Sequence, residues 1–211
     1  MESLREKMVK KQIEDRGIHN KRVLDAMRKV ERHKFVSARD MSEAYADYPL
    51  PIGYGQTISQ PYIVALMAEL CALDGFEKVL EIGTGCGYQA AVLSLLAKEV
   101  YSIEIIEQLA KSAAKRLGDL KYKNVFVKTG DGYKGWPEKA PFDVIILSAS
   151  PPDVPKTLLE QLGDGGVLVA PVGEYFQELI KIEKHNGIYS REKITYVRFV
   201  PMVHETVRKE G

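Results

Sequence analysis

Residues 79–91 constrain the fold of this chain more than any other stretch. Mostly apolar residues at 79–82 predict a buried strand, and three alternating glycines follow it at Gly83, Gly85 and Gly87. Glycine is favoured there because a Cβ would obstruct both a positive φ and the approach of a ligand to main-chain N–H groups. The residues that follow are compatible with a helix. We therefore predict a strand, a tight turn and a helix that bind a nucleotide-like ligand, with a ligand-free glycine turn as the simpler alternative.

The spacing of the glycines distinguishes between classes of ligand. Dinucleotide-binding turns carry the pattern G-x-G-x-x-G, whereas the third glycine here comes one residue early and Tyr88 takes its place. The acid Glu81, two residues before Gly83, extends the pattern to E-x-G-x-G-x-G. This pattern resembles motif I of the S-adenosylmethionine-dependent methyltransferases, which implies S-adenosylmethionine rather than NAD or FAD as the ligand.

Length and composition limit the remaining possibilities. A chain of 211 residues suits a single α/β domain, 1–211, with additions. A formal net charge of +1 gives no global attraction to nucleic acid or to an anionic membrane. The two cysteines and four histidines show no disulfide framework and no metal-ligand spacing, so no metal is expected. The charged N-terminus and the lack of a long apolar run predict a cytoplasmic protein without signal peptide or spanning helix.

Residues 1–74 predict N-terminal helices followed by a substrate loop. Apolar residues at helical spacing indicate two helices between Leu4 and Val30, the second of them capped by Asn20. Residues 43–55 mix aromatic residues with proline and glycine, which is typical of an irregular, partly buried loop and marks a candidate site. Ser59 followed by Pro61 predicts the start of an amphipathic helix.

Residues 75–173 alternate between strands and helices. After the glycine turn, strands are predicted at 99–104, 125–128, 142–147 and 167–171, and helices at 106–117 and 156–162. This alternation predicts an α/β fold with a doubly wound, mostly parallel sheet. Residues 174–211 break the alternation with antiparallel strands. Two strand-like runs flank Asn186 and Gly187 there, a dipeptide typical of a two-residue hairpin turn.

Several separate stretches together resemble one family, the protein-L-isoaspartate O-methyltransferases, which methylate the abnormal isoaspartyl carboxylate of aged proteins. The similar stretches are residues 50–61, 79–91, 130–132, 140–146, 165–173 and 197–202. The segment Gly-Gln-Thr-Ile-Ser-Gln-Pro at 55–61 is the most specific, because motif I is common to the whole methyltransferase class. The resemblance implies a Rossmann-like class I methyltransferase fold, S-adenosylmethionine as methyl donor with S-adenosylhomocysteine as product, and isoaspartyl proteins and peptides as partners.

The resemblance also implies which residues bind the donor at the carboxyl ends of the strands. They are Glu81, Gly83, Thr84, Gly85 and Gly87 for the methionine portion, Glu104 for the ribose hydroxyls, and Asp131 and Gly132 for the adenine. Glu104 also follows Gly83 by about 20 residues, the spacing of the ribose-binding acid in nucleotide folds. A solvated strand-end acid is the alternative for Glu104, and a plain Asp-Gly turn is the alternative for Asp131.

Ser59 is the residue that the resemblance marks as catalytic. Near a helix start its hydroxyl could bind a carboxylate, whereas an ordinary N-cap is the alternative. Thr57 and Ile58 are expected to bind the substrate beside it, and the main chain at Val200 and Pro201 to bind the peptide as an added strand. No general base is needed, because an isoaspartyl carboxylate with a pKa of roughly 3.5 to 4 is already anionic at pH 7.

Three other functions stay open. A methyltransferase with another acceptor, such as RNA or a small molecule, would share motif I. The base-methylation motifs Asn/Asp-Pro-Pro-aromatic and Pro-Cys are absent at 148–152, where the chain reads SASPP and the family often has Thr-Ala. A non-catalytic isoaspartyl-binding adaptor would be expected to carry an appended region, for which 211 residues leave no room. A nucleophilic Cys86 is disfavoured, because no histidine lies near it in the sequence. A monomer is expected.

Overall fold

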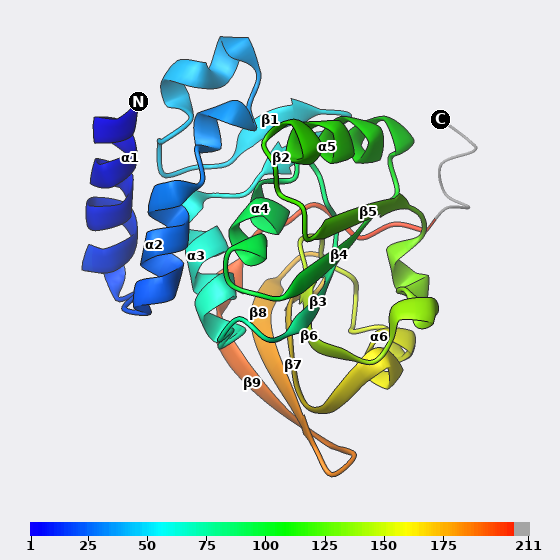
Figure 1. Cartoon of the computed structure of the whole chain (residues 1–211). Coiled ribbons are helices and arrows are strands. Elements are labelled where there is room, and N and C mark those ends of the chain that lie inside the picture. The colour runs from blue at the N-terminus through cyan, green and yellow to red at the C-terminus, as the bar shows by residue number, and fades with distance from the viewer. Residues whose placement is uncertain (205–211) are drawn as a thin grey trace.

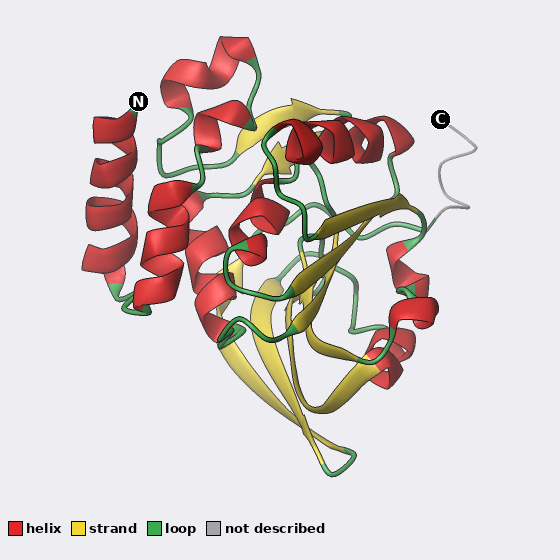
Figure 2. Ribbon diagram, in the orientation of Figure 1, coloured by secondary structure: helices red, strands yellow, loops and turns green. Residues whose placement is uncertain are grey.

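A seven-stranded sheet forms the centre of the fold, with helices on both faces (Figures 1 and 2). The strand order is β5-β4-β3-β6-β7-β8-β9. The strands are β3 (Lys78–Ile82), β4 (Glu99–Glu104), β5 (Val125–Thr129), β6 (Phe142–Leu147), β7 (Leu162–Val172), β8 (Gln177–His185) and β9 (Ile188–Val197). The structure is a computed structural model that describes residues 1–204. The end of the predicted C-terminal segment, 205–211, lies outside the described residues.

Strands β3 to β7 run parallel, whereas β8 and β9 run antiparallel to their neighbours. Strand β3 pairs with both β4 and β6, so the order of the strands reverses beside it, which is where such sheets bind ligands. His185 pairs with Ile188 across the C-terminal hairpin, and Asn186 and Gly187 between them take φ values of 51° and 76°. The predicted doubly wound, mostly parallel sheet and the predicted antiparallel hairpin are both confirmed.

Two hydrophobic clusters pack on the two faces of the sheet, because successive strand side chains alternate between faces. In β3, Val79 belongs to one cluster, and Leu80 and Ile82 belong to the other. The first face is covered by the helices α2 (Lys21–Lys29), α3 (Pro61–Leu70) and α4 (Tyr88–Ser94). The second face is covered by α6 (Lys156–Gln161) through Leu158. Helix α5 (Glu107–Asp119) connects β4 to β5.

The N-terminal helices pack beside α3 (Figure 1). Helix α1 (Glu2–Lys7) continues as a π-helix over Met8–Ile13 and a 3-10 turn over Glu14–Arg16, and α2 follows. The predicted cap is present, since Asn20 Oδ1 accepts hydrogen bonds from the main-chain N–H groups of Arg22 and Val23.

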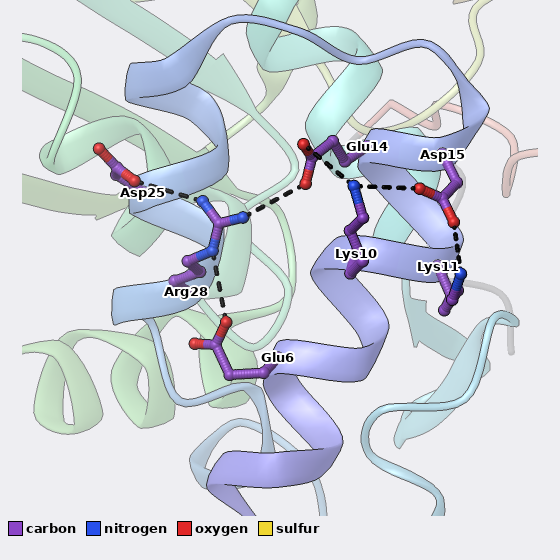
Figure 3. Close-up of polar contacts among 7 residues, drawn as sticks. All are labelled: Glu6, Lys10, Lys11, Glu14, Asp15, Asp25 and Arg28. Atoms are coloured by element: carbon purple, nitrogen blue, oxygen red, sulfur yellow. Dashed lines mark hydrogen bonds and ion pairs between the residues drawn. The ribbon is translucent and has the colours of Figure 1, made fainter.

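Ion pairs link the helices of this region (Figure 3). Arg28 of α2 lies within 3.5 Å of carboxylates of Glu6, Glu14 and Asp25. Each such half-exposed pair contributes at most about 1 kcal/mol. The buried side chains of Met8, Val9 and Ile13 therefore hold the helices in place more than the ion pairs do.

The prediction for residues 43–55 is wrong. The segment 43–55, expected to be irregular, contains β1 (Leu50–Gly53), which forms an antiparallel hairpin with β2 (Gln56–Ile58). Proline and glycine, which usually interrupt strands, concealed this short hairpin. The predicted helix start is confirmed, since α3 begins at Pro61, and the alternative role of Ser59 as its N-cap does not hold because Gln60 takes that position. Within residues 1–204, no helix has the length and apolar character needed to cross a membrane.

Candidate active site

A cavity of about 400 Å³ opens at the carboxyl ends of β3, β4 and β6. The loops after parallel strands meet at this edge of the sheet, and they bring together segments that lie far apart in the chain. The walls of the cavity include the glycine turn at 83–86, Glu104, Gly132, Ser148 and the segment 200–203. The β1–β2 hairpin covers one side through residues 55–58.

The glycine turn has the backbone that its sequence predicts. Gly83, Gly85 and Gly87 have φ values of 96°, 53° and 90°, and α4 begins immediately after Gly87. A Cβ built on Gly85 would lie 3.1 Å from Ile52 of the hairpin. Glycine at this turn therefore permits both the backbone conformation and the close approach of the covering hairpin.

Glu104 lies in the cavity wall at the end of β4. Its carboxylate accepts hydrogen bonds from the main-chain N–H groups of Gly85, at 2.8 Å, and Ile106, at 2.9 Å. These bonds fix the carboxylate in place and leave further acceptor positions on both oxygens. Glu104 is thus able to accept hydrogen bonds from a pair of hydroxyl groups, as a ribose would offer.

Glu81 is fully buried and is not among the residues that line the cavity. Its Oε2 accepts a hydrogen bond from Ser102 Oγ at 2.5 Å, and Ser102 Oγ lies 2.5 Å from Thr84 Oγ1. The pKa of Glu81 is raised to about 8, mainly because the side chain is buried. The hydrogen bond from Ser102 lowers this pKa, whereas the charge of Glu104 raises it. Glu81 is therefore connected to the ligand cavity through Ser102 and Thr84, and its burial favours the neutral acid over the carboxylate.

Asp131 and Gly132 follow β5 at the opposite wall. Asp131 Oδ1 accepts a hydrogen bond from Tyr133 N at 2.9 Å, and Oδ2 lies 3.2 Å from Nδ1 of His204, whose ring stacks on Tyr133. Gly132 lines the cavity, whereas Asp131 does not. A Cβ on Gly132 would lie 2.3 Å from Ile82 Cγ2, so this wall requires a glycine.

Gln89 is a cavity residue to which the sequence assigned no role. It lies in the first turn of α4, it is 8% exposed, and its Nε2 has no hydrogen-bond partner among the described residues. A buried amide without an acceptor is costly, so a ligand acceptor at this point would stabilise the side chain. The signal in the sequence was a single amide in a helix that is mostly apolar.

The residues of the cavity fit the predicted donor, S-adenosylmethionine. The unpartnered Gln89 amide can donate to an acceptor, the Glu104 carboxylate can accept from hydroxyls, and the glycine turn permits close approach of the ligand. Cys86 also lines the cavity, but burial raises the pKa of its thiol, which disfavours a nucleophilic thiolate. No group of three or more potential metal ligands occurs within residues 1–204.

A second groove of about 550 Å³ adjoins the first cavity. Of the residues that the structure describes, Thr57, Ser59, Ser148 and Val200 line both spaces. The predicted catalytic Ser59 thus lies where the two spaces meet, together with Thr57. Ile58 and Pro201 line the first cavity but not the groove. Ser148 follows β6, and the sequence indicated it only as a departure from the family pattern.

The segment at Val200 and Pro201 is held by Ser150. Ser150 N donates to Val200 O, and Met202 N donates to Ser150 O, both at 2.8 Å. Within residues 1–204, the main-chain N–H of Val200 donates no backbone hydrogen bond. A main-chain donor is therefore available beside the point where the two spaces meet.

Comparisons with known proteins place the chain in a family. The model of the family "Protein-L-isoaspartate(D-aspartate) O-methyltransferase (PCMT)" matches residues 2–207. Protein-L-isoaspartate O-methyltransferase 2 of Shewanella sediminis is 53% identical over 209 residues, which cover 98% of this chain and 86% of the relative. The protein-L-isoaspartate O-methyltransferase of Dictyoglomus turgidum is 55% identical over 194 residues, covering 92% and 88%.

Solved structures agree with this assignment. A protein-L-isoaspartate O-methyltransferase superposes with a TM-score of 0.87 at 29% identity, covering 95% of this chain and 66% of that longer chain. A Plasmodium falciparum protein described by the same name, solved with S-adenosyl-L-homocysteine, shares the fold with a TM-score of 0.81 at 24% identity, covering 94% and 98%. The resemblance seen in the sequence is thereby confirmed, and the chain belongs to the protein-L-isoaspartate(D-aspartate) O-methyltransferase family.

Proposed function

We propose that this protein is a repair methyltransferase that transfers a methyl group from S-adenosylmethionine to the free carboxylate of L-isoaspartyl residues in damaged proteins and peptides. D-aspartyl residues are a second acceptor to be tested. One observation carries the proposal: a donor cavity and a peptide-sized groove meet at Thr57, Ser59, Ser148 and Val200. Transfer between two substrates requires such a meeting point.

The first cavity binds and orients S-adenosylmethionine through residues that the structure already holds in place. Glu104 would accept hydrogen bonds from the ribose hydroxyls, and the Gln89 amide and the glycine turn would hold the amino-acid portion. Glu81 positions Thr84 through Ser102 rather than contacting the ligand itself. Gly132 provides the space for the adenine, and Asp131 holds the turn that presents it. When bound, S-adenosylmethionine supplies a methyl carbon activated by the positive charge of its sulfur.

The acceptor carboxylate needs orientation rather than deprotonation. With a pKa of roughly 3.5 to 4, it is the anionic nucleophile at pH 7. The hydroxyls of Ser59, Thr57 and Ser148 are able to donate hydrogen bonds to it at the meeting point. They would turn one of its oxygens toward the donor cavity and displace water, and such proximity and orientation lower the barrier to transfer.

The peptide main chain has a natural binding edge at 198–200. The free N–H of Val200 can donate to a peptide carbonyl, so the peptide binds as an added strand. Main-chain recognition suits a repair enzyme, because damaged sites occur in many sequences. We further expect a monomer that acts on cytoplasmic proteins, and the net charge of +1 gives no reason to expect nucleic-acid or membrane partners.

Methyl transfer from labelled S-adenosylmethionine tests the function directly. The acceptor is an isoaspartyl peptide, and the matching aspartyl peptide is the control. We expect label in the isoaspartyl peptide only. Binding without transfer would favour a non-catalytic adaptor, and transfer to RNA or to a small molecule but to neither peptide would favour another acceptor class.

The role of Ser59 has its own test. Ser59 does not cap α3, so removing its hydroxyl should leave stability nearly unchanged. We expect Ser59→Ala to lower kcat/KM on the isoaspartyl peptide by about tenfold, the effect of about 1.4 kcal/mol from one lost hydrogen bond to a charged group. An unchanged kcat/KM in a folded variant would remove Ser59 from the mechanism.

A further inference from the structure

Among the described residues that line the substrate groove, Arg198 is the one with a charged side chain. The residues that line it are otherwise uncharged: Pro49, Thr57, Ser59, Gln60, Ile63, Ser148, Tyr196, Val197, Phe199 and Val200. Arg198 is exposed, and in the described part of the chain its guanidinium makes no ion pair or hydrogen bond. An unpartnered cation in a neutral groove gives the groove a net positive potential.

Three other charged side chains, on the neighbouring strand β9 and on the segment before Pro49, are already paired. Lys193 lies 2.5 Å from Glu178, and Arg191 lies 3.2 Å from Asp153. On the opposite wall, the Asp47 carboxylate that precedes Pro49 is paired with Arg16 at 2.7 Å. Arg198 is therefore the charge that a bound peptide would encounter.

The backbone on both sides of Arg198 is fixed, so the point from which its side chain extends is defined. Phe199 N donates to Gln177 Oε1 at 2.6 Å, and Gln177 Nε2 donates to Phe199 O at 3.1 Å. Gln177 is buried in β8, where it pairs with Val197. Val200 is held by Ser150 at the other end.

The distance between Val200 and Arg198 determines which residue of a bound peptide lies beside Arg198. Val200 lies where the groove meets the donor cavity, and Arg198 lies two residues before it. Two residues of extended chain span about 6–7 Å. A peptide that runs along 198–200 with its reacting carboxylate beside Ser59 therefore places a side chain two positions from the isoaspartyl residue next to Arg198.

From this placement, and resting on the proposed function, we infer that Arg198 is a specificity-determining residue that favours isoaspartyl substrates with an acidic side chain two positions from the damaged residue. An acid at that point is attracted to the guanidinium and a lysine is repelled. Solvent-exposed charge pairs are weak, and the exchange of Glu for Lys adds an attraction and a repulsion. We expect about a fivefold difference in kcat/KM between the two substrates, mostly in KM.

The test uses isoaspartyl peptides that differ at one position. Glu, Gln or Lys is placed two residues before or two residues after the isoaspartyl residue. The N-terminus is acetylated and the C-terminus amidated, so that the side chain is the only added charge. The wild-type protein is compared with Arg198→Gln, Arg198→Glu and Arg198→Lys. Lys98→Gln is the matched control. Lys98 is exposed and precedes the first residue of β4, so it lies at the opposite end of the strands from the cavity.

We expect the ratio of kcat/KM between Glu and Lys peptides to be about five in the wild type, on one side of the isoaspartyl residue. The ratio should fall to near one in Arg198→Gln and invert in Arg198→Glu. It should persist in Arg198→Lys and in Lys98→Gln. High salt should reduce the ratio in the wild type, because exposed charges are screened. Equal ratios in the wild type and Arg198→Gln, with all peptides methylated, would overturn the inference alone. No methylation of any isoaspartyl peptide by the wild type would overturn the proposed function, and the inference with it.

Discussion

At the scale of single residues, Glu81 links the site to stability. Its pKa is about 8 in the folded protein against an ordinary value of 4.5, so the fold favours the protonated form. Between those two pKa values the unfolded chain has released a proton that the folded chain keeps, and stability falls as pH rises. We predict that wild-type unfolding free energy decreases by about 3 kcal/mol more than that of Glu81→Gln between pH 4.5 and pH 7.

Denaturant unfolding of both proteins across this pH range measures the difference. Gln keeps an oxygen that can accept from Ser102 but does not titrate, so its pH profile should be flatter. Parallel profiles for the two proteins would show that the buried carboxyl does not titrate as described.

Two glycines give a matched pair of substitutions at the same scale. A Cβ at Gly132 would meet Ile82 at 2.3 Å, whereas a Cβ at Gly118 of α5 would meet no atom within 4 Å. We predict that Gly132→Ala lowers the unfolding free energy by about 1–3 kcal/mol and weakens binding of S-adenosylhomocysteine. Gly118→Ala should raise stability by up to about 1 kcal/mol. Denaturation and calorimetry measure both, and equal effects of the two variants would contradict the wall geometry.

At the scale of elements, the C-terminal hairpin protects the Asn-Gly dipeptide in its turn against deamidation. Asn-Gly is prone to deamidation, because glycine does not shield the main-chain nitrogen that attacks the asparagine side chain. Here Asn186 is held at a φ of 51°, and Gly187 N donates to Asp164 Oδ1 at 3.2 Å. We predict that Asn186 deamidates more slowly in the folded protein than in a free peptide of the same sequence.

The variant Asp164→Ala should accelerate deamidation in the folded protein, because it removes the acceptor for Gly187 N. Mass spectrometry of aged samples measures isoaspartate at position 186. Equal rates in the wild type, the variant and the free peptide would show that the turn gives no protection.

The elements also show what sequence patterns could predict. The strand at 142–147 was predicted with its observed bounds because a central parallel strand is almost continuously apolar. The β1–β2 hairpin was missed, because Pro51 and the glycines are typical of a loop and only tertiary packing makes them a strand pair. The strand β7 starts at Leu162, five residues earlier than expected, across glycines that weaken a strand pattern.

The site shows a similar division between local pattern and packing. The glycine turn and Glu104 could be placed because each follows a strand that the pattern defines. Glu81 was expected to contact the ligand, but its side chain points onto one face of the sheet, where Ser102 intervenes. Gln89 and Ser148 enter the cavity through the packing of α4 and the end of β6, which a pattern along the chain does not contain.

At the scale of the whole molecule, methyl transfer requires the two spaces that meet at Ser59. The sheet presents the donor cavity at its carboxyl edge, and the β1–β2 hairpin and the segment 196–200 form the groove beside it. The most direct measurement is a crystal structure of the protein with S-adenosylhomocysteine and an isoaspartyl peptide. We predict the peptide main chain along 198–200 and its isoaspartyl carboxylate between the Ser59 hydroxyl and the sulfur. A peptide bound elsewhere, with its carboxylate away from Ser59, would contradict the account.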